Sequence, residues 1–255
     1  METDLRILIV VAFTGLLVVL RLDAARFGAA EYDDDAAGGG WRAGLRRLAW
    51  YAVGLAIAAG IFVAHPTPGA TLGLAIGTPR LAAIGLGLLF GGAGAGVAAA
   101  FAWLRYGRLR LPSARTYPGA IANSLGTALI DEVAFRGAFM GLLLAAGLPI
   151  VSAVAIQGLV YGLATRLGAP GRSHAMLLMS LALGVAAGAT VIATGGIGAA
   201  VIGHAIARFA IFVCTGHAGQ VRPPGEEPEE VAEDHLPPEG WQVADEPPVA
   251  GMQRS

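Results

Sequence analysis

Charged residues are scarce in this chain of 255 residues, where they make up 14% of the sequence. A soluble globular domain usually carries about 25% charged residues, so the composition excludes that class. The single cysteine, Cys214, excludes an intrachain disulfide and a cluster of thiolate metal ligands. The net charge is −1, and no basic tract indicates a nucleic-acid partner. Hydrophobic residues make up 55% of the chain, in long runs that predict an all-α, polytopic integral membrane helical bundle.

Seven apolar stretches are long enough to cross a bilayer, which takes a helix of about 17–25 residues. They cover residues 5–22, 48–64, 81–104, 119–147, 150–167, 175–193 and 197–214. Arg6 and Arg21 lie at the two ends of the first stretch, where their side chains are expected to reach the headgroups. Trp50 and Tyr51 open the second stretch and are expected at headgroup depth.

Glycine and proline positions predict close packing and breaks in the helices. In the third stretch, Gly87/Gly91 and Gly92/Gly96 are pairs of the small-xxx-small type, which lets neighbouring helices approach closely. Residues 65–80 contain three prolines and predict a broken loop with one interfacial turn. The histidine at the start of this loop is expected to be solvated.

Arginines are distributed unevenly between the two ends of the expected bundle. Eleven lie at the end where the first stretch finishes: Arg21, Arg26, Arg42, Arg46, Arg47, Arg105, Arg108, Arg110, Arg115, Arg166 and Arg172. Two, Arg6 and Arg80, lie at the opposite end. Because basic residues concentrate in cytoplasmic loops, we expect the N-terminus outside and the C-terminus in the cytoplasm. The expected location is the inner membrane of a bacterial cell.

Three regions are expected along the chain. Residues 1–118 form an N-terminal transmembrane region with three spans and two arginine-rich cytoplasmic loops, and residues 119–215 form a core of four spans. Residues 216–255 hold nine Asp or Glu and seven Pro with almost no aliphatic run. Such a composition buries too little apolar surface to fold, so a disordered acidic cytoplasmic tail is expected.

The motif of residues 131–136, DEVAFR, places three ionisable groups inside an apolar stretch. Each charged Asp or Arg at the centre of a transmembrane helix costs roughly 2.5–3.5 kcal/mol, so an intramembrane carboxylate is a functional-site candidate by default. Glu132 and Arg136 are four residues apart, share a helix face and can pair. Asp131 lies about 100° around the helix and can point at a different neighbour.

The remaining polar residues at membrane depth form stripes on later helices. These residues are Asn123, Ser124, Thr127, Gln157, Tyr161, Thr165, Thr190, His204 and Arg208. Two sets keep helical spacing, residues 157/161/165 and residues 204/208, and each set therefore lines one face of its helix. If both faces meet the acidic motif, a carboxylate can take the proton of a water while the donors stabilise an oxyanion.

In order and spacing these residues resemble the CAAX protease and bacteriocin-processing (CPBP) family, which are intramembrane endopeptidases that include the type II CAAX prenyl proteases. The family pattern is Glu-Glu-x-x-x-Arg, then Phe-x-x-x-His, then His-x-x-x-Asn, and the resemblance covers about residues 119–213. In that family the first Glu and the middle His hold and activate a water. The resemblance implies that the first Glu falls on Asp131, the second on Glu132 and the motif Arg on Arg136.

The second and third parts of the pattern fall on two later helices. The resemblance implies that the Phe falls on Tyr161 and the middle His on Thr165. The last His and the Asn, which in the family stabilise the oxyanion of the attacked peptide, fall on His204 and Arg208. The glutamate at 132, the arginine at 136 and the histidine at 204 match outright, and the other positions depart from the pattern.

The departures bear directly on the chemistry. Asp131 is one methylene shorter than Glu, and a misplacement of about 1 Å can cost about 10²-fold in rate. Thr165 can hydrogen-bond a water but cannot act as a base near neutral pH. Arg208 can donate to an oxyanion, and if it reaches Asp131 it weakens that carboxylate as a base.

The acidic motif also has structural interpretations. The Glu132–Arg136 pair can have a purely structural role, in which it holds the bundle together. This interpretation of the pair is favoured. Asp131 either activates a water or pairs with Arg208. The distances among these side chains decide between the alternatives.

The later residues have alternatives as well. His204 is an oxyanion donor, a metal ligand, or a histidine satisfied by a neighbouring helix. For Tyr161 and Thr165, hydrogen bonding between helices is favoured. A metal site is not favoured, because catalytic zinc usually takes three protein ligands and position 165 lacks the histidine.

The expected function is therefore that of an intramembrane endopeptidase that cleaves a peptide or membrane-protein substrate near the cytoplasmic side. The expected surroundings are membrane lipids, and no cofactor is expected. The rival hypothesis is a catalytically silent family member that acts as a membrane scaffold or binding protein. A small transporter or channel is a third hypothesis, against which the lack of an internal repeat counts.

Overall fold

The computed structural model describes residues 3–29, 40–106, 118–168 and 174–215. The elements are α1 (Thr3–Leu22), η1 (Ala24–Phe27), α2 (Gly40–Ala64), α3 (Pro68–Thr71), α4 (Arg80–Tyr106), α5 (Pro118–Asp131), η3 (Glu132–Phe139), α6 (Met140–Ala145), α7 (Ile150–Leu167), α8 (His174–Thr194) and α9 (Gly198–Thr215). This part of the chain is helical and contains no strand, which confirms the all-α prediction. The predicted acidic tail, residues 216–255, lies outside the described residues.

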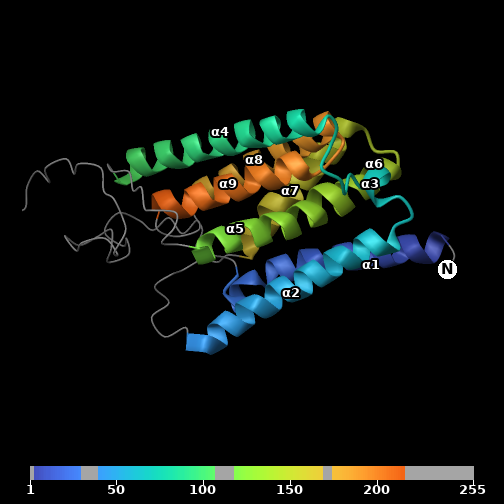
Figure 1. The fold of residues 1–255 in the computed structure, drawn as a ribbon, viewed down its shortest axis with the longest axis horizontal. Helices are drawn as coiled ribbons and strands as arrows, with labels where there is room; N and C mark the ends of the chain where they lie inside the picture. The colour runs from blue at the N-terminus through green and yellow to red at the C-terminus, as the bar shows by residue number, and fades with distance from the viewer. Residues whose placement is uncertain (1–2, 30–39, 107–117, 169–173, 216–255) are drawn as a thin grey trace, which may run out of the picture.

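The long helices lie side by side in a bundle, with α1 and α2 along one edge, α4 and α9 along the other, and α5 and α7 between them (Figure 1). Among the described residues, five helices are long and apolar enough to cross a membrane, within α1, α2, α4, α7 and α8. A shorter apolar helix covers Gly198–Cys214 of α9, and α5, η3 and α6 follow one another without a gap. The protein is an integral membrane protein with the polytopic helical fold that the sequence predicts.

The second helix begins earlier than the sequence pattern predicts. It starts at Gly40, eight residues before the expected start at residue 48. As a result Trp50 lies inside the helix and is fully buried, and its Nε1–H donates to the Leu20 C=O at 2.9 Å. The contact with α1 buries the Trp50 ring, and the expected position of Trp50 at headgroup depth stays a prediction.

Glycines on α4 allow close packing against α9. A Cβ on Gly87 would lie 2.9 Å from the Ala199 carbonyl oxygen, and a Cβ on Gly91 would lie 2.7 Å from Ile206 Cβ. The Gly87/Gly91 prediction is therefore confirmed. For Gly92 and Gly96, the second predicted pair, no heavy atom lies within 4 Å of the point that a Cβ would occupy, so the prediction for that pair was wrong.

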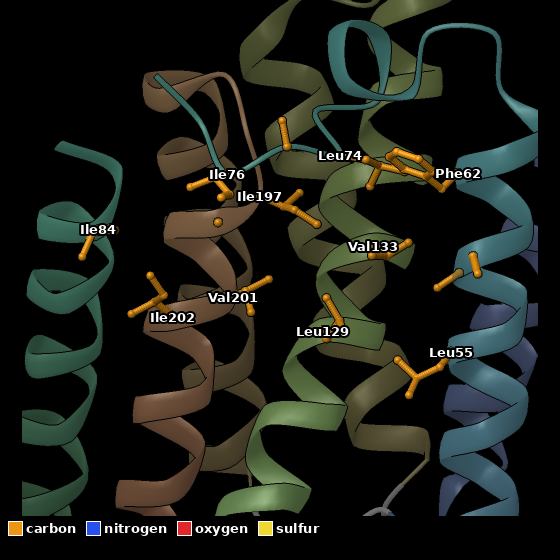
Figure 2. Close-up of a pocket in the computed structure, with 14 residues that line it drawn as sticks. Leu55, Phe62, Leu74, Ile76, Ile84, Leu129, Val133, Ile197, Val201 and Ile202 are labelled. Carbon is orange, nitrogen blue, oxygen red and sulfur yellow. The ribbon is translucent and has the colours of Figure 1, made fainter. Parts of the chain in front are cut away.

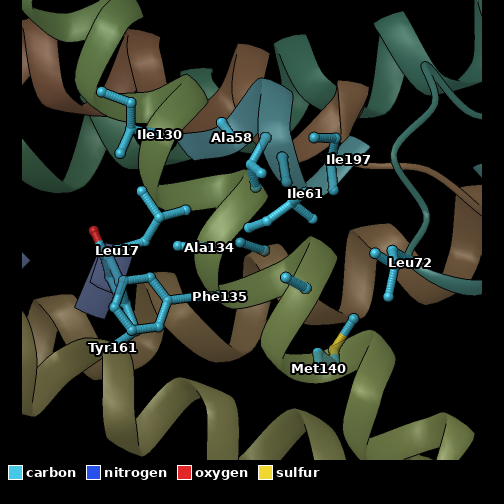
Figure 3. Close-up of a cluster of buried hydrophobic side chains, with 14 of the residues drawn as sticks. Leu17, Ala58, Ile61, Leu72, Ile130, Ala134, Phe135, Met140, Tyr161 and Ile197 are labelled. Carbon is cyan, nitrogen blue, oxygen red and sulfur yellow. The ribbon is translucent and has the colours of Figure 1, made fainter. Parts of the chain in front are cut away.

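The largest buried apolar cluster joins the two edges of the bundle. In Figure 3, Leu17 of α1, Ile61 of α2, Ile130 of α5 and Phe135 of η3 point toward one another, and Tyr161 of α7 lies beside Phe135. Each of these side chains is at most 3% exposed. The cluster fixes α1 and α2 against the helices that carry the acidic motif.

The loop of residues 65–80 folds back onto the bundle. Its one short helix, α3, agrees with the predicted single turn. Leu72 is buried and packs where Gly141 of α6 leaves room for it. The Ile197 N–H donates to the Gly73 C=O at 2.9 Å, and these contacts hold the loop against the start of α9. The loop thus covers the end of the bundle at which α1 begins.

Candidate active site

The acidic motif lies at a change of helix type. Asp131 ends α5, and Glu132 opens η3, which is a π-helix of eight residues. The Met140 N–H donates to the Phe135 C=O, five residues back, as this geometry requires. π-helical turns are rare and are frequent at functional sites. Residues 132–138 are all buried, so the motif faces the interior of the bundle.

Glu132 is the centre of a buried polar network. Arg136 Nη1 lies 3.2 Å from Glu132 Oε1, which confirms that the two residues share a helix face. His204 Nδ1 lies 2.8 Å from the same oxygen. Glu132 and Arg136 are at most 1% exposed and His204 is 4% exposed. The histidine of α9 and the motif on η3 are thus in direct contact.

Tyr161 brings α7 into this network. Its hydroxyl lies 3.1 Å from His204 Nε2, so both ring nitrogens of the histidine are engaged. The Arg136 guanidinium carbon lies 4.0 Å from the centre of the Tyr161 ring, a cation–π contact. The Phe135 ring meets the same ring edge to face, with centroids 5.3 Å apart. These contacts confirm the prediction that the stripe on α7 faces the acidic motif at Tyr161.

Asp131 pairs with a cation of α1. Its Oδ2 lies 3.5 Å from Arg21 Nε, and both side chains are at most 2% exposed. The prediction that Arg21 reaches toward the headgroups was therefore wrong, because a buried carboxylate offers its guanidinium a partner. Neither oxygen of Asp131 has a hydrogen-bond partner among the described residues.

Arg208 is tied to α5 and α2. Its Nε donates to Asn123 Oδ1 at 3.2 Å, and Asn123 Nδ2 donates to the Tyr51 hydroxyl at 2.6 Å. The Tyr51 hydroxyl also lies 3.2 Å from Thr127 Oγ1. The stripe of residues 204/208 therefore faces η3 at His204 and α5 at Arg208.

The other predicted residues of α7 differ in their surroundings. Thr165 is 3% exposed, and its hydroxyl has no hydrogen-bond partner in the described part of the chain. Gln157 turns toward α8, where its Nε2 donates to the Gly184 C=O at 2.7 Å. The stripe on α7 thus divides, with Gln157 joining two helices and Tyr161 serving the network.

Two residues that contact the candidate site, Arg21 and Tyr51, were not identified from the sequence. Arg21 looked like an ordinary arginine at the end of a membrane span, and no local pattern marks it as the partner of Asp131. Tyr51 looked like an interfacial aromatic, yet it bonds to Asn123 and Thr127. These bonds depend on how α2 packs against α5, which no local pattern around Tyr51 indicates.

The donor set offers little to a catalytic metal ion, which usually has three protein ligands. Across residues 3–29, 40–106, 118–168 and 174–215, no three His, Cys, Asp or Glu side chains are grouped closely enough to hold a metal. Glu132 Oε1 and His204 Nδ1 bond to each other, and position 165 carries a threonine.

An apolar cavity of about 680 Å³ adjoins the polar network. Figure 2 shows it between α2, α5, α9 and α4, with the loop that contains Leu74 at one end. Leu129 and Val133 line it on either side of the acidic pair, and Val201 lines it one turn before His204. The described residues that line the cavity are all uncharged. It therefore offers an apolar compartment beside the site.

Comparison with known proteins adds one match. Residues 113–210 match the family model described as type II CAAX prenyl endopeptidase, Rce1-like. The matched segment includes all six candidate residues: Asp131, Glu132, Arg136, Thr165, His204 and Arg208. The match confirms the resemblance to the CAAX proteases that the motifs indicate. No curated protein and no solved structure matches the chain.

Proposed function

We propose that this integral membrane protein, whose residues 113–210 match the Rce1-like type II CAAX prenyl endopeptidases, is an intramembrane endopeptidase. The observation that carries the proposal is the 2.8 Å contact between His204 Nδ1 and Glu132 Oε1, which joins the first and last family motifs. Carboxylates, an imidazole, a phenol and guanidinium groups are gathered here away from bulk water. These are the groups that acid–base hydrolysis uses.

In the proposed mechanism Asp131 takes the proton of the attacking water. Both of its oxygens are buried without hydrogen-bond partners among the described residues, so a water can donate to either. The equally unpartnered Thr165 hydroxyl is proposed to help hold that water. The water oxygen attacks the carbonyl carbon of the peptide, and the carbonyl oxygen becomes the oxyanion. Collapse of this intermediate breaks the C–N bond, and Asp131 returns the proton to the leaving amine. A covalent intermediate is not proposed, because the group contains no serine or cysteine.

The oxyanion is proposed to be stabilised by His204 and Arg208. In the imidazolium form both ring nitrogens of a histidine donate. Nδ1 would donate to Glu132, and Nε2 would donate to the oxyanion, which takes the place of the Tyr161 hydroxyl. The bond from Arg208 Nε to Asn123 Oδ1 holds the second donor in place.

The decisive experiment measures peptide cleavage by the purified protein in lipid nanodiscs. Asp131→Asn and His204→Gln are expected to reduce kcat by about 10²-fold or more, which is the usual size of a lost acid–base contribution. Glu132→Gln should also reduce kcat, because the neutral amide holds the His204 ring in place less strongly than the carboxylate does. His65→Gln, a change to a buried histidine outside the site, is the control. Cleavage that survives all three site substitutions unchanged would remove this mechanism.

The apolar cavity is proposed to hold hydrophobic side chains of the substrate. Ala59 lines it from α2, whereas Val63, one turn further on, is 75% exposed and does not line it. Ala59→Trp should therefore raise KM about tenfold or more by filling the space, by analogy with the 1–3 kcal/mol that overpacking costs. Val63→Trp should leave KM unchanged. Equal KM values for the two variants would place the substrate elsewhere.

The rival proposal is a catalytically silent member that binds a membrane partner. The contact between Arg21 and Asp131 favours it, because a buried ion pair serves structure as readily as catalysis. The threonine at position 165 favours it too. Activity that appears only in a Thr165→His/Arg208→Asn variant would support the silent member, and activity in the unaltered protein would exclude it.

The membrane orientation is also a proposal. Among the described residues, Arg21, Arg26, Arg42, Arg46 and Arg47 lie at the end of the bundle where α1 finishes. Arg6 and Arg80 lie at the other end. This bias supports an N-terminus outside, a cytoplasmic C-terminus and cleavage near the cytoplasmic side, in a bacterial inner membrane surrounded by its lipids.

A further inference from the structure

Arg21 stands in the interior of the bundle although it belongs to α1. It is 2% exposed, and its Nε lies 3.5 Å from Oδ2 of Asp131, the first acid of the motif. The two residues are more than one hundred positions apart, and Arg21 precedes the family-matched segment of residues 113–210. The first helix therefore supplies a cation to the candidate site.

The surrounding structure fixes the end of α1. The Leu20 C=O accepts a hydrogen bond from Trp50 Nε1 of α2 at 2.9 Å. On the other side, Gly168 at the end of α7 lies so close to the Arg21 carbonyl that a Cβ at position 168 would overlap it. The end of α1 is thus held between α2 and α7, and the Arg21 side chain has a defined origin from which to reach Asp131.

The contact balances charge while hydrogen-bonding atoms of both groups stay unused. Nε and Nη2 of Arg21 and both oxygens of Asp131 have no hydrogen-bond partner among the described residues. A carboxylate that is buried without a cation is costly, whereas one that arginine holds bidentately has about half of its four acceptor sites already occupied. Here the charge is compensated while donors and acceptors stay open to a water or to a peptide group.

We propose that Arg21 is a positioning residue of the active site, which holds Asp131 in place for the attacking water. This inference rests on the proposed function. It makes α1 part of the catalytic unit, so that the family-matched segment alone is incomplete. The other cation on α1, Arg6, provides a matched control because it bonds to the Ala64 C=O and Val63 C=O at the opposite end of the helix.

The test compares the full-length protein with Arg21→Met, Arg21→Lys, Asp131→Asn, Arg21→Met/Asp131→Asn and Arg6→Met. The melting temperature in detergent and the kcat and KM for peptide cleavage are measured for each. Arg21→Met should lower the melting temperature, because it leaves a buried carboxylate unpaired, and the double variant should recover most of that loss. Arg21→Met should also lower kcat by about 10²-fold with KM little changed, and Arg21→Lys should restore part of it.

Three results would overturn the inference: a melting temperature of Arg21→Met equal to that of the unaltered protein, strictly additive losses in the double variant, or the same kcat loss in Arg6→Met. If the unaltered protein cleaves no peptide, the proposed function fails and the positioning role fails with it. The melting temperatures then still decide whether Arg21 and Asp131 are coupled, so the two failures are distinguishable.

Discussion

At the scale of single residues, the Tyr161 hydroxyl can be removed while the ring contacts of this residue are kept. Tyr161→Phe keeps the ring that Arg136 and Phe135 contact, and it leaves His204 Nε2 without its neighbour at 3.1 Å. We expect the free energy of unfolding to fall by about 1–3 kcal/mol, the cost of a buried unsatisfied polar atom.

The matched control is Thr14→Val, because the Thr14 hydroxyl bonds only to the Val10 C=O of its own helix. Unfolding in mixed detergent micelles measures both variants. A Tyr161→Phe variant as stable as the unaltered protein would show that the hydroxyl contributes nothing to the network.

His65 was expected to be solvated but is buried, with 5% of its surface exposed. Burial, and then the positive charge of Arg6, lower the pKa of His65 below its ordinary value. Below the unfolded-state pKa of about 6.5 the unfolded chain therefore takes up a proton that the folded chain does not hold. Stability should fall as the pH drops through that range, until the folded His65 also becomes protonated.

The measurement is the melting temperature of the unaltered protein and of His65→Gln between about pH 8 and about pH 5. The variant should lose less stability on acidification, since it lacks this titrating group. Melting temperatures that fall equally with pH in the two proteins would show that His65 does not cause this pH dependence.

At the scale of elements, two adjacent glycines of α4 should respond in opposite directions to the same substitution. Gly91→Ala places a Cβ against Ile206 and should cost about 1–3 kcal/mol of unfolding free energy, as overpacking does. Gly92→Ala meets no atom within 4 Å and should gain about 0.5–1 kcal/mol from reduced backbone freedom in the unfolded chain. Changes of the same sign in both variants would show that α4 does not present this face to α9.

Most elements could be predicted from the sequence because the bilayer forces a long apolar run to be a helix. The spacing of Glu132 and Arg136 was sufficient to predict their contact, since it depends only on helix geometry. The start of α2 could not be predicted, because residues 40–47 contain three arginines and two glycines and so do not continue the apolar run. The π-helix could not be predicted either, since nothing in DEVAFR distinguishes it from an α-helix.

At the scale of the whole molecule, the arginine bias predicts which loops face outward. In a Cys214→Ser background, Ala70→Cys lies at the end where α1 begins and Arg46→Cys lies at the opposite end, and both positions are exposed. In intact cells a membrane-impermeant maleimide should label residue 70 and should label residue 46 only after permeabilisation. The reverse pattern would invert the proposed orientation.

The contacts of the candidate site differ in how far the sequence could predict them. The family pattern placed His204 and Glu132 in one site, but it did not specify the contact between them. The contact between Arg21 and Asp131 followed from no motif, because it depends on how α1 packs against helices that follow it by more than one hundred residues. Contacts between residues that lie so far apart in the chain produce no periodic pattern in a single sequence.

The π-helix of residues 132–139 makes the register of this crossing sensitive to insertions and deletions. Upstream of it, Asn123 faces Tyr51, and downstream of it, Gly141 faces Leu72. Each residue of an α-helix turns the chain by about 100°, so removing one residue between these contacts would rotate one half away from its partner. The segment between Asn123 and Gly141 should therefore keep its length across natural variants, even where its side chains change.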